Sequence, residues 1–230
     1  MAYKWIVPCS TMNKTKTKMT AKSSMIVPVI GKLFCSPSEI ILVVRNRPQV
    51  VNGGGFVVTN PKKNHKIVFM VDGCGVLGKK EEVILKDADG TKLLIIRRKG
   101  GIVEAVSLYK RWNGYKYNLS GSSQELVFCL KDPKPSCLNK NSPIKISIRS
   151  NACSNLRDFE IVGYFPDRDC TIVEQSTGIV VAQVGVRKEV GQVMTNKDLY
   201  HVIIKPGIDQ AFVFGVIAVL DYIYDGSTTW

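Results

Sequence analysis

The residues with the most suggestive chemical spacing are Gly73, Gly75 and Gly78, which Lys79 and Lys80 follow directly. Glycines at this spacing bind the pyrophosphate of dinucleotides when they connect a strand to the N-terminus of a helix. Here the next residues, EEVILKDADG, have the composition of a strand that ends in a tight turn. No room is left for the helix, so we predict a loop between hairpins and no nucleotide site.

The cysteines and histidines do not have the spacing of a metal or catalytic site. The chain contains no C-x-x-C pair, and its two histidines, His65 and His201, are far apart in the sequence. No segment matches G-x-S-x-G or H-x-x-x-H. We therefore expect no metal, no cofactor and no enzymatic activity, and we expect the cysteines to be free thiols. The seven cysteines are Cys9, Cys35, Cys74, Cys129, Cys137, Cys153 and Cys170.

Positive charge is the strongest functional signal in the composition. The chain has 32 Lys and Arg against 19 Asp and Glu, a formal net charge of +13. Such an excess favours polyanionic partners, namely phospholipid headgroups, nucleic acid or an acidic protein. On a strand, Arg97 and Lys99 would share one face and Arg98 would take the other, because successive side chains alternate. The candidate binding residues are Lys79, Lys80, Arg97, Arg98, Lys99, Lys110 and Arg111.

Short β-branched segments separated by turn residues occupy most of the chain from residue 40 onward. The sequences NPKKNHK, DADGTK, RWNGYK and EQSTG have turn composition and connect successive strands. Two hairpins, 83–99 and 171–187, resemble copies of each other, with Gly90 aligned on Gly178. About twelve antiparallel strands favour a closed barrel, because closure removes exposed sheet edges. The predicted strands cover residues 40–44, 55–59, 66–71, 82–87, 92–98, 105–112, 125–130, 144–149, 158–165, 170–175, 179–186 and 199–205.

The segment from Pro206 to Gly226 contains a stretch that is apolar on every side. It is too short to cross a bilayer, which needs about 20 apolar residues, so we expect no transmembrane span. A barrel of about twelve strands is too wide for its own side chains to fill. We therefore predict a central helix at about 209–224 that fills the barrel, with Asp209 as its N-cap. The side chains expected to fill the barrel are Phe212, Phe214, Val216, Ile217, Val219 and Leu220.

The first 25 residues differ in composition from the rest. Four lysines lie among Ser and Thr between residues 10 and 25, and no acidic residue precedes Glu39. This composition predicts a flexible basic arm at 1–25, followed by a single domain at 26–230. The N-terminus lacks the continuous apolar stretch of a signal peptide. We expect an intracellular monomer in the cytoplasm, with the plasma membrane surface and the nucleus as further locations.

Three segments together resemble the plant LURP-one-related proteins. They are VDGCGVLGKKEEVILKDADGTKLLIIRRK, DFEIVGYFPDRDCTIVEQSTGIVVAQV and VIIKPGIDQAFVFGVIAVLDYIYD. The resemblance covers roughly residues 45 to 226, and P-G-x-D-x-A-F in the last segment is its most specific part. It implies a tubby-like fold, in which a twelve-stranded barrel encloses a hydrophobic central helix. It also implies kinship with the phospholipid scramblases. The sequence DGCG departs from the family, whose members commonly carry a polar or aromatic residue near Cys74.

The resemblance implies a function in binding. Tubby-like domains bind phosphoinositides through clustered Lys and Arg on the barrel exterior, and they are proposed to be membrane-tethered transcription regulators. The leading hypothesis is therefore a non-enzymatic module that binds anionic phospholipid headgroups, with a role in transcription or defence signalling. The alternatives are a DNA-binding transcription factor and a scaffold for signalling proteins that has no lipid ligand.

Overall fold

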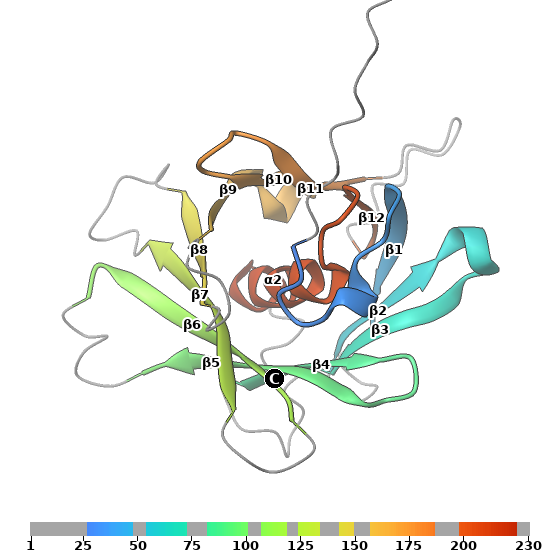
Figure 1. The fold of residues 1–230 in the computed structure, drawn as a ribbon, viewed down its shortest axis with the longest axis horizontal. Helices are drawn as coiled ribbons and strands as arrows, with labels where there is room; N and C mark the ends of the chain where they lie inside the picture. Colours follow the sequence, from blue (N-terminus) through green and yellow to red (C-terminus); the bar gives the residue numbers. More distant parts are fainter. Residues whose placement is uncertain are drawn as a thin grey trace, which may run out of the picture.

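Twelve antiparallel strands close into a barrel around one α-helix (Figure 1). The structure is a computed structural model, and it describes residues 27–47, 54–72, 82–100, 107–118, 124–133, 143–149, 157–186 and 198–224. Each strand pairs with its neighbour in sequence, and β1 closes the barrel against β12. The predicted fold class, a closed antiparallel barrel with a central C-terminal helix, is confirmed.

The strands agree closely with the β-branched segments of the sequence. They are β1 (Ile40–Asn46), β2 (Gly55–Asn60), β3 (Lys66–Asp72), β4 (Glu82–Asp87), β5 (Lys92–Lys99), β6 (Tyr109–Lys116), β7 (Glu125–Pro133), β8 (Ile144–Ile148), β9 (Asp158–Tyr164), β10 (Asp169–Glu174), β11 (Val180–Gly185) and β12 (Leu199–Ile204). Three short 3-10 helices accompany them: η1 (Lys32–Phe34), η2 (Pro61–Lys63) and η3 (Phe165–Asp167).

The prediction for β6 was wrong at both ends. We predicted a strand at 105–112 followed by a turn at RWNGYK, whereas β6 runs from Tyr109 to Lys116 and includes Asn113 and Gly114. The Asn-Gly pair lies within the strand because Gly114 faces the barrel interior, where a Cβ would lie 2.3 Å from the Phe128 ring. A glycine inside a strand often marks such a close approach. Packing of Gly114 against Phe128 therefore keeps the Asn-Gly pair within a strand, although the local sequence favours a turn.

Helix α2 (Gln210–Tyr224) fills the barrel as predicted. Its residues are buried continuously from Gln210 to Asp221. Phe212 packs against Phe128 and Phe159 on the strands, with ring centroids 5.6 Å apart in both cases, and Phe214 packs against Phe69 at 5.5 Å. A helix that is apolar on all sides is stable in water only when it is enclosed on all sides, and the barrel provides that enclosure.

Asp209 fixes the N-terminal end of α2. Its Oδ2 accepts backbone N–H groups from Val29, Ile30 and Gly31 at 2.7–3.0 Å, and its Oδ1 accepts the N–H of Phe212 at 3.2 Å. The predicted N-cap is thereby confirmed, and the same carboxylate also holds residues 29–31 against the barrel end. Burial raises the pKa of the Asp209 carboxyl, and the four backbone donors oppose that shift.

Arg168 and Asp221 meet near the C-terminal end of α2. Arg168 is buried, lies in the left-handed region at φ +54°, and stacks on the rings of Phe165 and Tyr200 with its guanidinium carbon 4.4 Å from each centroid. Its guanidinium lies 4.0 Å from the buried carboxylate of Asp221. The two ends of the helix are thus attached to the barrel by different polar contacts.

The two hairpins that resemble copies lie on opposite sides of α2 (Figure 1). One is formed by β4 and β5 and the other by β10 and β11, six strands apart in the closed order. Gly90 and Gly178 have φ values of +84° and +69° in the two turns. The same left-handed glycine therefore terminates both turns, as their aligned sequences suggest.

Candidate functional site

Arg97 lies on the outer face of β5 and is already engaged by neighbouring side chains. Its Nε donates to Glu82 Oε2 at 2.6 Å, and one terminal nitrogen donates to Gln124 Oε1 at 2.7 Å. The guanidinium carbon also lies 6.0 Å from the centroid of the Tyr115 ring. These contacts assign Arg97 to the structure of the β4–β5 hairpin. Of the other candidates, Lys79 and Lys80 lie outside the described residues.

Arg98 and Lys110 lie on the opposite side of the sheet from Arg97. Arg98 is paired in register with the buried Trp112, and Lys110 is paired with the buried Asp132. Burial raises the pKa of the Asp132 carboxyl, and the charges of Lys110 and Arg98 partly offset this rise. The structure thus places these two candidates beside an acidic group at the inner rim of the barrel.

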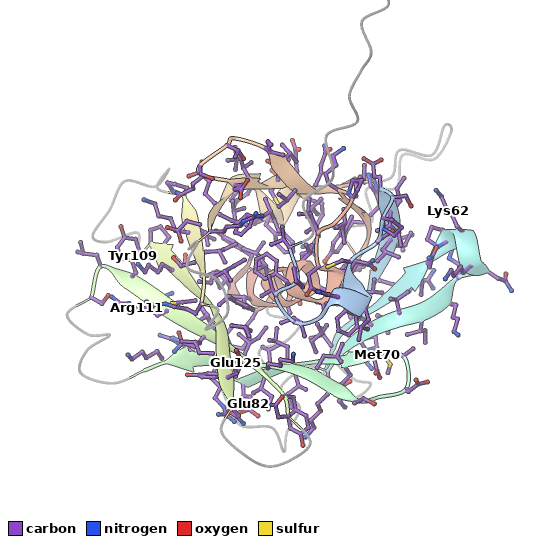
Figure 2. The ribbon with its side chains drawn as sticks, in the orientation of Figure 1. Lys62, Met70, Glu82, Tyr109, Arg111 and Glu125 are labelled. Carbon is purple, nitrogen blue, oxygen red and sulfur yellow. The ribbon has the colours of Figure 1, made fainter. Side chains whose placement is uncertain are left out.

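Lys99 and Arg111 lie together on the outer face, and two further lysines extend them into a row. Lys99 is directly opposite Arg111, Arg111 is opposite Lys131, and Lys131 is opposite Lys145. We call these four residues the basic row; Figure 2 shows Arg111 on β6, at the periphery of the barrel. With strands about 4.8 Å apart, the row is about 14 Å long.

Cys129 lies on the same outer face, and nearby positive charges affect the pKa of its thiol. Burial raises the pKa of its thiol, and the positive charges of Lys131, Arg111, Arg149 and Lys99 act against that rise. Arg149 follows β8 directly, and its backbone N–H donates to Val127 O at 2.8 Å. Three members of the basic row and Arg149 therefore act on one thiol, in agreement with the strand register that places Cys129 on their face of the sheet.

Within the described part of the chain, the cations of the basic row form no ion pair, although Lys145 is directly opposite Glu160 on β9. No carboxylate there lies within 4.0 Å of the side-chain nitrogens of Lys99, Arg111, Lys131, Lys145 or Arg149. The Nε of Arg111 is buried and has no hydrogen-bond partner in that part of the chain. Like charges directly opposite each other on a sheet destabilise it. Sheet stability therefore does not account for the row.

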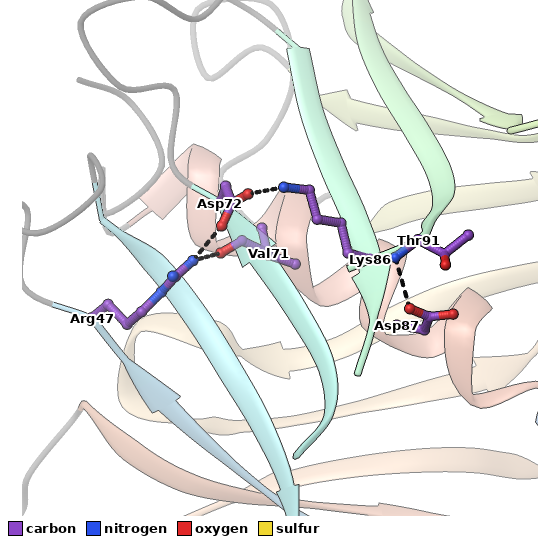
Figure 3. Close-up of polar contacts among 6 residues, drawn as sticks. All are labelled: Arg47, Val71, Asp72, Lys86, Asp87 and Thr91. Carbon is purple, nitrogen blue, oxygen red and sulfur yellow. Dashed lines mark hydrogen bonds and ion pairs between the residues drawn. The ribbon is translucent and has the colours of Figure 1, made fainter. Parts of the chain in front are cut away.

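Two cations, Arg47 at the end of β1 and Lys86 on β4, share an acidic partner. At the ends of β1 and β3, Asp72 accepts from Arg47 at 2.8 Å and from Lys86, and Arg47 also donates to Val71 O at 2.6 Å (Figure 3). Burial opposes ionisation of Asp72, but the hydrogen bonds and charges of Arg47 and Lys86 outweigh it and lower the pKa of the carboxyl. Arg47 and Lys86 are thus neutralised by Asp72, whereas Lys99, Arg111 and Lys131 of the basic row face one another across the strands.

The barrel end that carries the basic row also exposes apolar side chains. Leu108 precedes β6 and is 49% exposed, while Tyr164 at the end of β9 and Tyr224 at the end of α2 are 56% and 42% exposed. The Tyr164 and Tyr224 rings are in contact, with centroids 6.1 Å apart. Cations beside exposed aromatic and aliphatic groups are typical of surfaces that bind at a membrane–water interface.

The thiols and the helix can be compared with the predictions within the described residues. Cys35, Cys129 and Cys170 are free thiols, and burial raises the pKa of Cys35 to about 11 and of Cys170 to about 12. The remaining four cysteines lie outside the described residues.

Among the residues that the structure describes, no group of three metal-ligating side chains is present. No described helix has both the length and the apolar character needed to span a bilayer.

Sequence reasoning identified Lys99 and Arg111 but missed Lys131, Lys145 and Arg149. The missed residues are distant from the two others in sequence, and strand register brings them together. A signal was present in IKISIR, where Lys145 and Arg149 alternate with the isoleucines that face the interior. That alternation gives the face but not the neighbouring strand, so the row itself was not predictable from spacing.

Comparisons with known proteins agree with this architecture. A search of solved structures found an X-ray structure of an Arabidopsis thaliana protein with a TM-score of 0.58 and 21% sequence identity. The match covers 85% of this chain and 98% of that one. At this identity the likeness establishes the fold, and it supports the closed barrel described above.

Sequence relatives are considerably closer. The chain is 53% identical to protein LURP-one-related 6 of Arabidopsis thaliana, across 87% of this chain and 98% of that protein. It is 49% identical to protein LURP-one-related 16 of the same plant, across 91% and 99% of the two chains. The family model described as LURP-one-related matches residues 40–221, which include all twelve strands and most of α2. The chain therefore belongs to the LURP-one-related family.

Proposed function

We propose that this protein is a non-enzymatic module that binds anionic phospholipid headgroups at a membrane surface through the basic row. The observation that carries the proposal is the direct opposition of Lys99, Arg111 and Lys131, which form no ion pair within the described residues and which Lys145 extends toward Glu160. A multiply charged phosphate ligand would remove the repulsion between these cations and accept their hydrogen bonds. Phosphoinositides are the anionic lipids that carry several phosphates on one headgroup.

The surroundings of the row favour a membrane over nucleic acid. The exposed Leu108 and Tyr164 lie at the same end of the barrel and suit the apolar side of an interface. The described α-helix is enclosed by the barrel and is not positioned to enter a DNA groove. In this proposal the module holds the protein at the plasma membrane, and release from the membrane would serve a transcriptional or defence-signalling role.

Replacing three row residues tests the proposal. Lys99→Ala, Arg111→Ala and Lys131→Ala together should weaken binding to phosphatidylcholine vesicles containing phosphatidylinositol 4,5-bisphosphate by more than tenfold. Each cation at a membrane surface contributes about 1 kcal/mol, which is about fivefold in affinity. Vesicle co-sedimentation measures the change, and affinity should fall steeply with added salt because the Debye length shortens.

A matched control removes the same charge elsewhere. Lys62, Lys63 and Lys66 are exposed beside η2, and Figure 2 shows Lys62 on the side of the molecule away from Arg111. Their triple replacement by Ala should leave most of the vesicle affinity intact. Equal losses in both variants would indicate attraction by net charge alone and would contradict the proposed site. Binding of wild-type protein to duplex DNA but not to vesicles would replace the lipid proposal with the nucleic-acid alternative.

A further inference from the structure

A cavity of about 530 Å³ lies between β8, β9 and the C-terminal end of α2. This volume is within the range of about 300–1,000 Å³ that is usual for small-molecule sites. Its wall exposes nearly as much polar as apolar surface, and Glu160 is the one charged residue among the described lining residues. The cavity is lined by Pro143, Ile144, Glu160, Ile161, Val162, Gly163, Tyr164, Phe165, Leu220 and Tyr224.

The cavity exists because β9 is longer than β8 at this end. Pairing between the two strands reaches Ile144 and Ile161, whereas β9 continues to Tyr164. Among the described residues, the last three residues of β9 pair with β10 but have no strand partner on the β8 side. Gly163 is required there, because its φ is +99° and a Cβ would lie 2.4 Å from the carbonyl oxygen of Asp169.

The cavity opens to the surface and does not form part of the sealed core. Val162, Tyr164 and Tyr224 line it and are 49%, 56% and 42% exposed. Ile161 and Leu220 line its inner part and are 6% and 1% exposed. A ligand that entered beside Val162 would therefore pass from solvent to the buried side chains of Ile161 and Leu220.

The basic row ends at this cavity. Lys145, its last residue, follows Ile144 of the cavity wall and is directly opposite Glu160, another wall residue. Gln175 Nε2 holds the Glu160 carboxylate at 3.1 Å. A negative charge at the cavity disfavours a phosphate there and favours one beside Lys131 and Arg111. An apolar group would instead be favoured in the cavity, where it contacts the buried side chains of Ile161 and Leu220. The row and the cavity together therefore match a ligand with an anionic part and an apolar part.

We infer that the cavity takes one acyl chain of the anionic lipid whose headgroup lies on the basic row. The inference rests on the proposed function and adds a second recognition element to it. The protein then recognises a lipid molecule partly withdrawn from the bilayer, with the phosphates on β6–β8 and the chain beside β9. Affinity depends on the length of the chain as well as on the charge of the headgroup.

Soluble ligands of increasing chain length test this inference. Isothermal titration calorimetry with the full chain would compare inositol 1,4,5-trisphosphate with phosphatidylinositol 4,5-bisphosphates that carry butanoyl, hexanoyl or octanoyl chains. Each buried methylene group adds about 0.8 kcal/mol, so a step of two methylenes should raise affinity by up to about fifteenfold. The rise should stop once the cavity is full.

Val162→Trp narrows the cavity opening at a half-exposed position and supplies the matched variant. It should abolish the dependence on chain length and leave the affinity for inositol 1,4,5-trisphosphate unchanged. Ile179→Trp, at a 56% exposed position that does not line the cavity, should behave as wild type. If thermal unfolding shows that Val162→Trp does not fold, Val162→Phe applies the same test with a smaller ring.

The outcomes separate the inference from the proposed function. Equal affinity of wild-type protein for all four ligands would overturn the acyl-chain inference and leave headgroup binding on the basic row in place. Persistence of the chain-length dependence in the folded Val162 variant would also overturn it, because the chain would then lie elsewhere. Failure of every ligand to bind would overturn the proposed function itself, together with the inference that rests on it.

Discussion

Arg97 and Lys99 lie on the same face of β5 but have different surroundings. Arg97 is held by Glu82 and Gln124, whereas Lys99 is exposed and is directly opposite Arg111. A sequence cluster such as Arg97-Arg98-Lys99 therefore contains a structural residue, an inner-rim residue and a candidate ligand-binding residue. Replacing all three would remove the hairpin ion pair as well as one row charge. For this reason the test of function uses Lys131 and Arg111 in place of Arg97 and Arg98.

The buried carboxylate of Asp209 accepts four backbone hydrogen bonds. Asp209→Ala would leave four backbone N–H groups without an acceptor, and each unsatisfied donor costs about 1–3 kcal/mol. We expect the free energy of unfolding, measured in urea, to fall by at least about 3 kcal/mol. Asp209→Asn keeps one acceptor oxygen and should cause an intermediate loss.

Asp87 provides the control for this prediction. Its Oδ1 accepts the backbone N–H of Asp89 at 3.0 Å in an exposed turn. It also accepts the backbone N–H of Thr91 at 2.8 Å (Figure 3). Water can replace that carboxylate, so Asp87→Ala should cost about 1 kcal/mol or less. Equal losses at the two positions would show that burial does not distinguish them and would contradict the role assigned to Asp209.

At the scale of elements, β6 shows what local sequence patterns predict and what they miss. Alternation and β-branched composition correctly predicted that twelve strands exist and that the 209–224 segment is enclosed by them. The Asn-Gly pair at 113–114 misled the prediction, because it is a strong turn signal. Contact between Gly114 and the Phe128 ring, which belongs to another strand, decides the outcome. The basic row was missed because it also depends on contacts between different strands. The register that forms it is set when the barrel closes and is not encoded in the spacing along one strand.

Gly114→Ala tests this explanation of β6. The new methyl group would overlap the Phe128 ring, which packs edge-on against Phe212 of α2. Overpacking of this kind costs about 1–3 kcal/mol, and urea unfolding should show a loss of that size. Gly31→Ala is the control, because its nearest neighbour would be 3.6 Å away, and its effect should be within about 0.5 kcal/mol. A neutral Gly114→Ala variant would mean that the ring moves aside without cost.

At the scale of the whole molecule, the barrel and α2 depend on each other. The strands direct large apolar side chains inward, and those side chains pack on a helix that occurs once in the described chain. Removing residues 209–230 should therefore abolish the cooperative urea transition and the near-ultraviolet circular dichroism of the fold. Removing residues 1–25, which precede the first described contact at Val27, should preserve both. A truncated protein without α2 that stayed soluble and unfolded cooperatively would contradict the role assigned to the helix.

The position of α2 after all twelve strands has a consequence for how the protein is made. A ribosome releases the chain from its N-terminus, so every strand emerges before the residues that will occupy the space between them. Until residue 209 and those after it emerge, the nascent strands expose apolar side chains and unpaired edges, which are the features that promote aggregation. β1 also has no partner for closure until β12, which ends at Ile204, has been synthesised. The barrel is therefore expected to close only after α2 has left the ribosome, and until then the nascent strands are natural clients for chaperones that shield apolar surfaces.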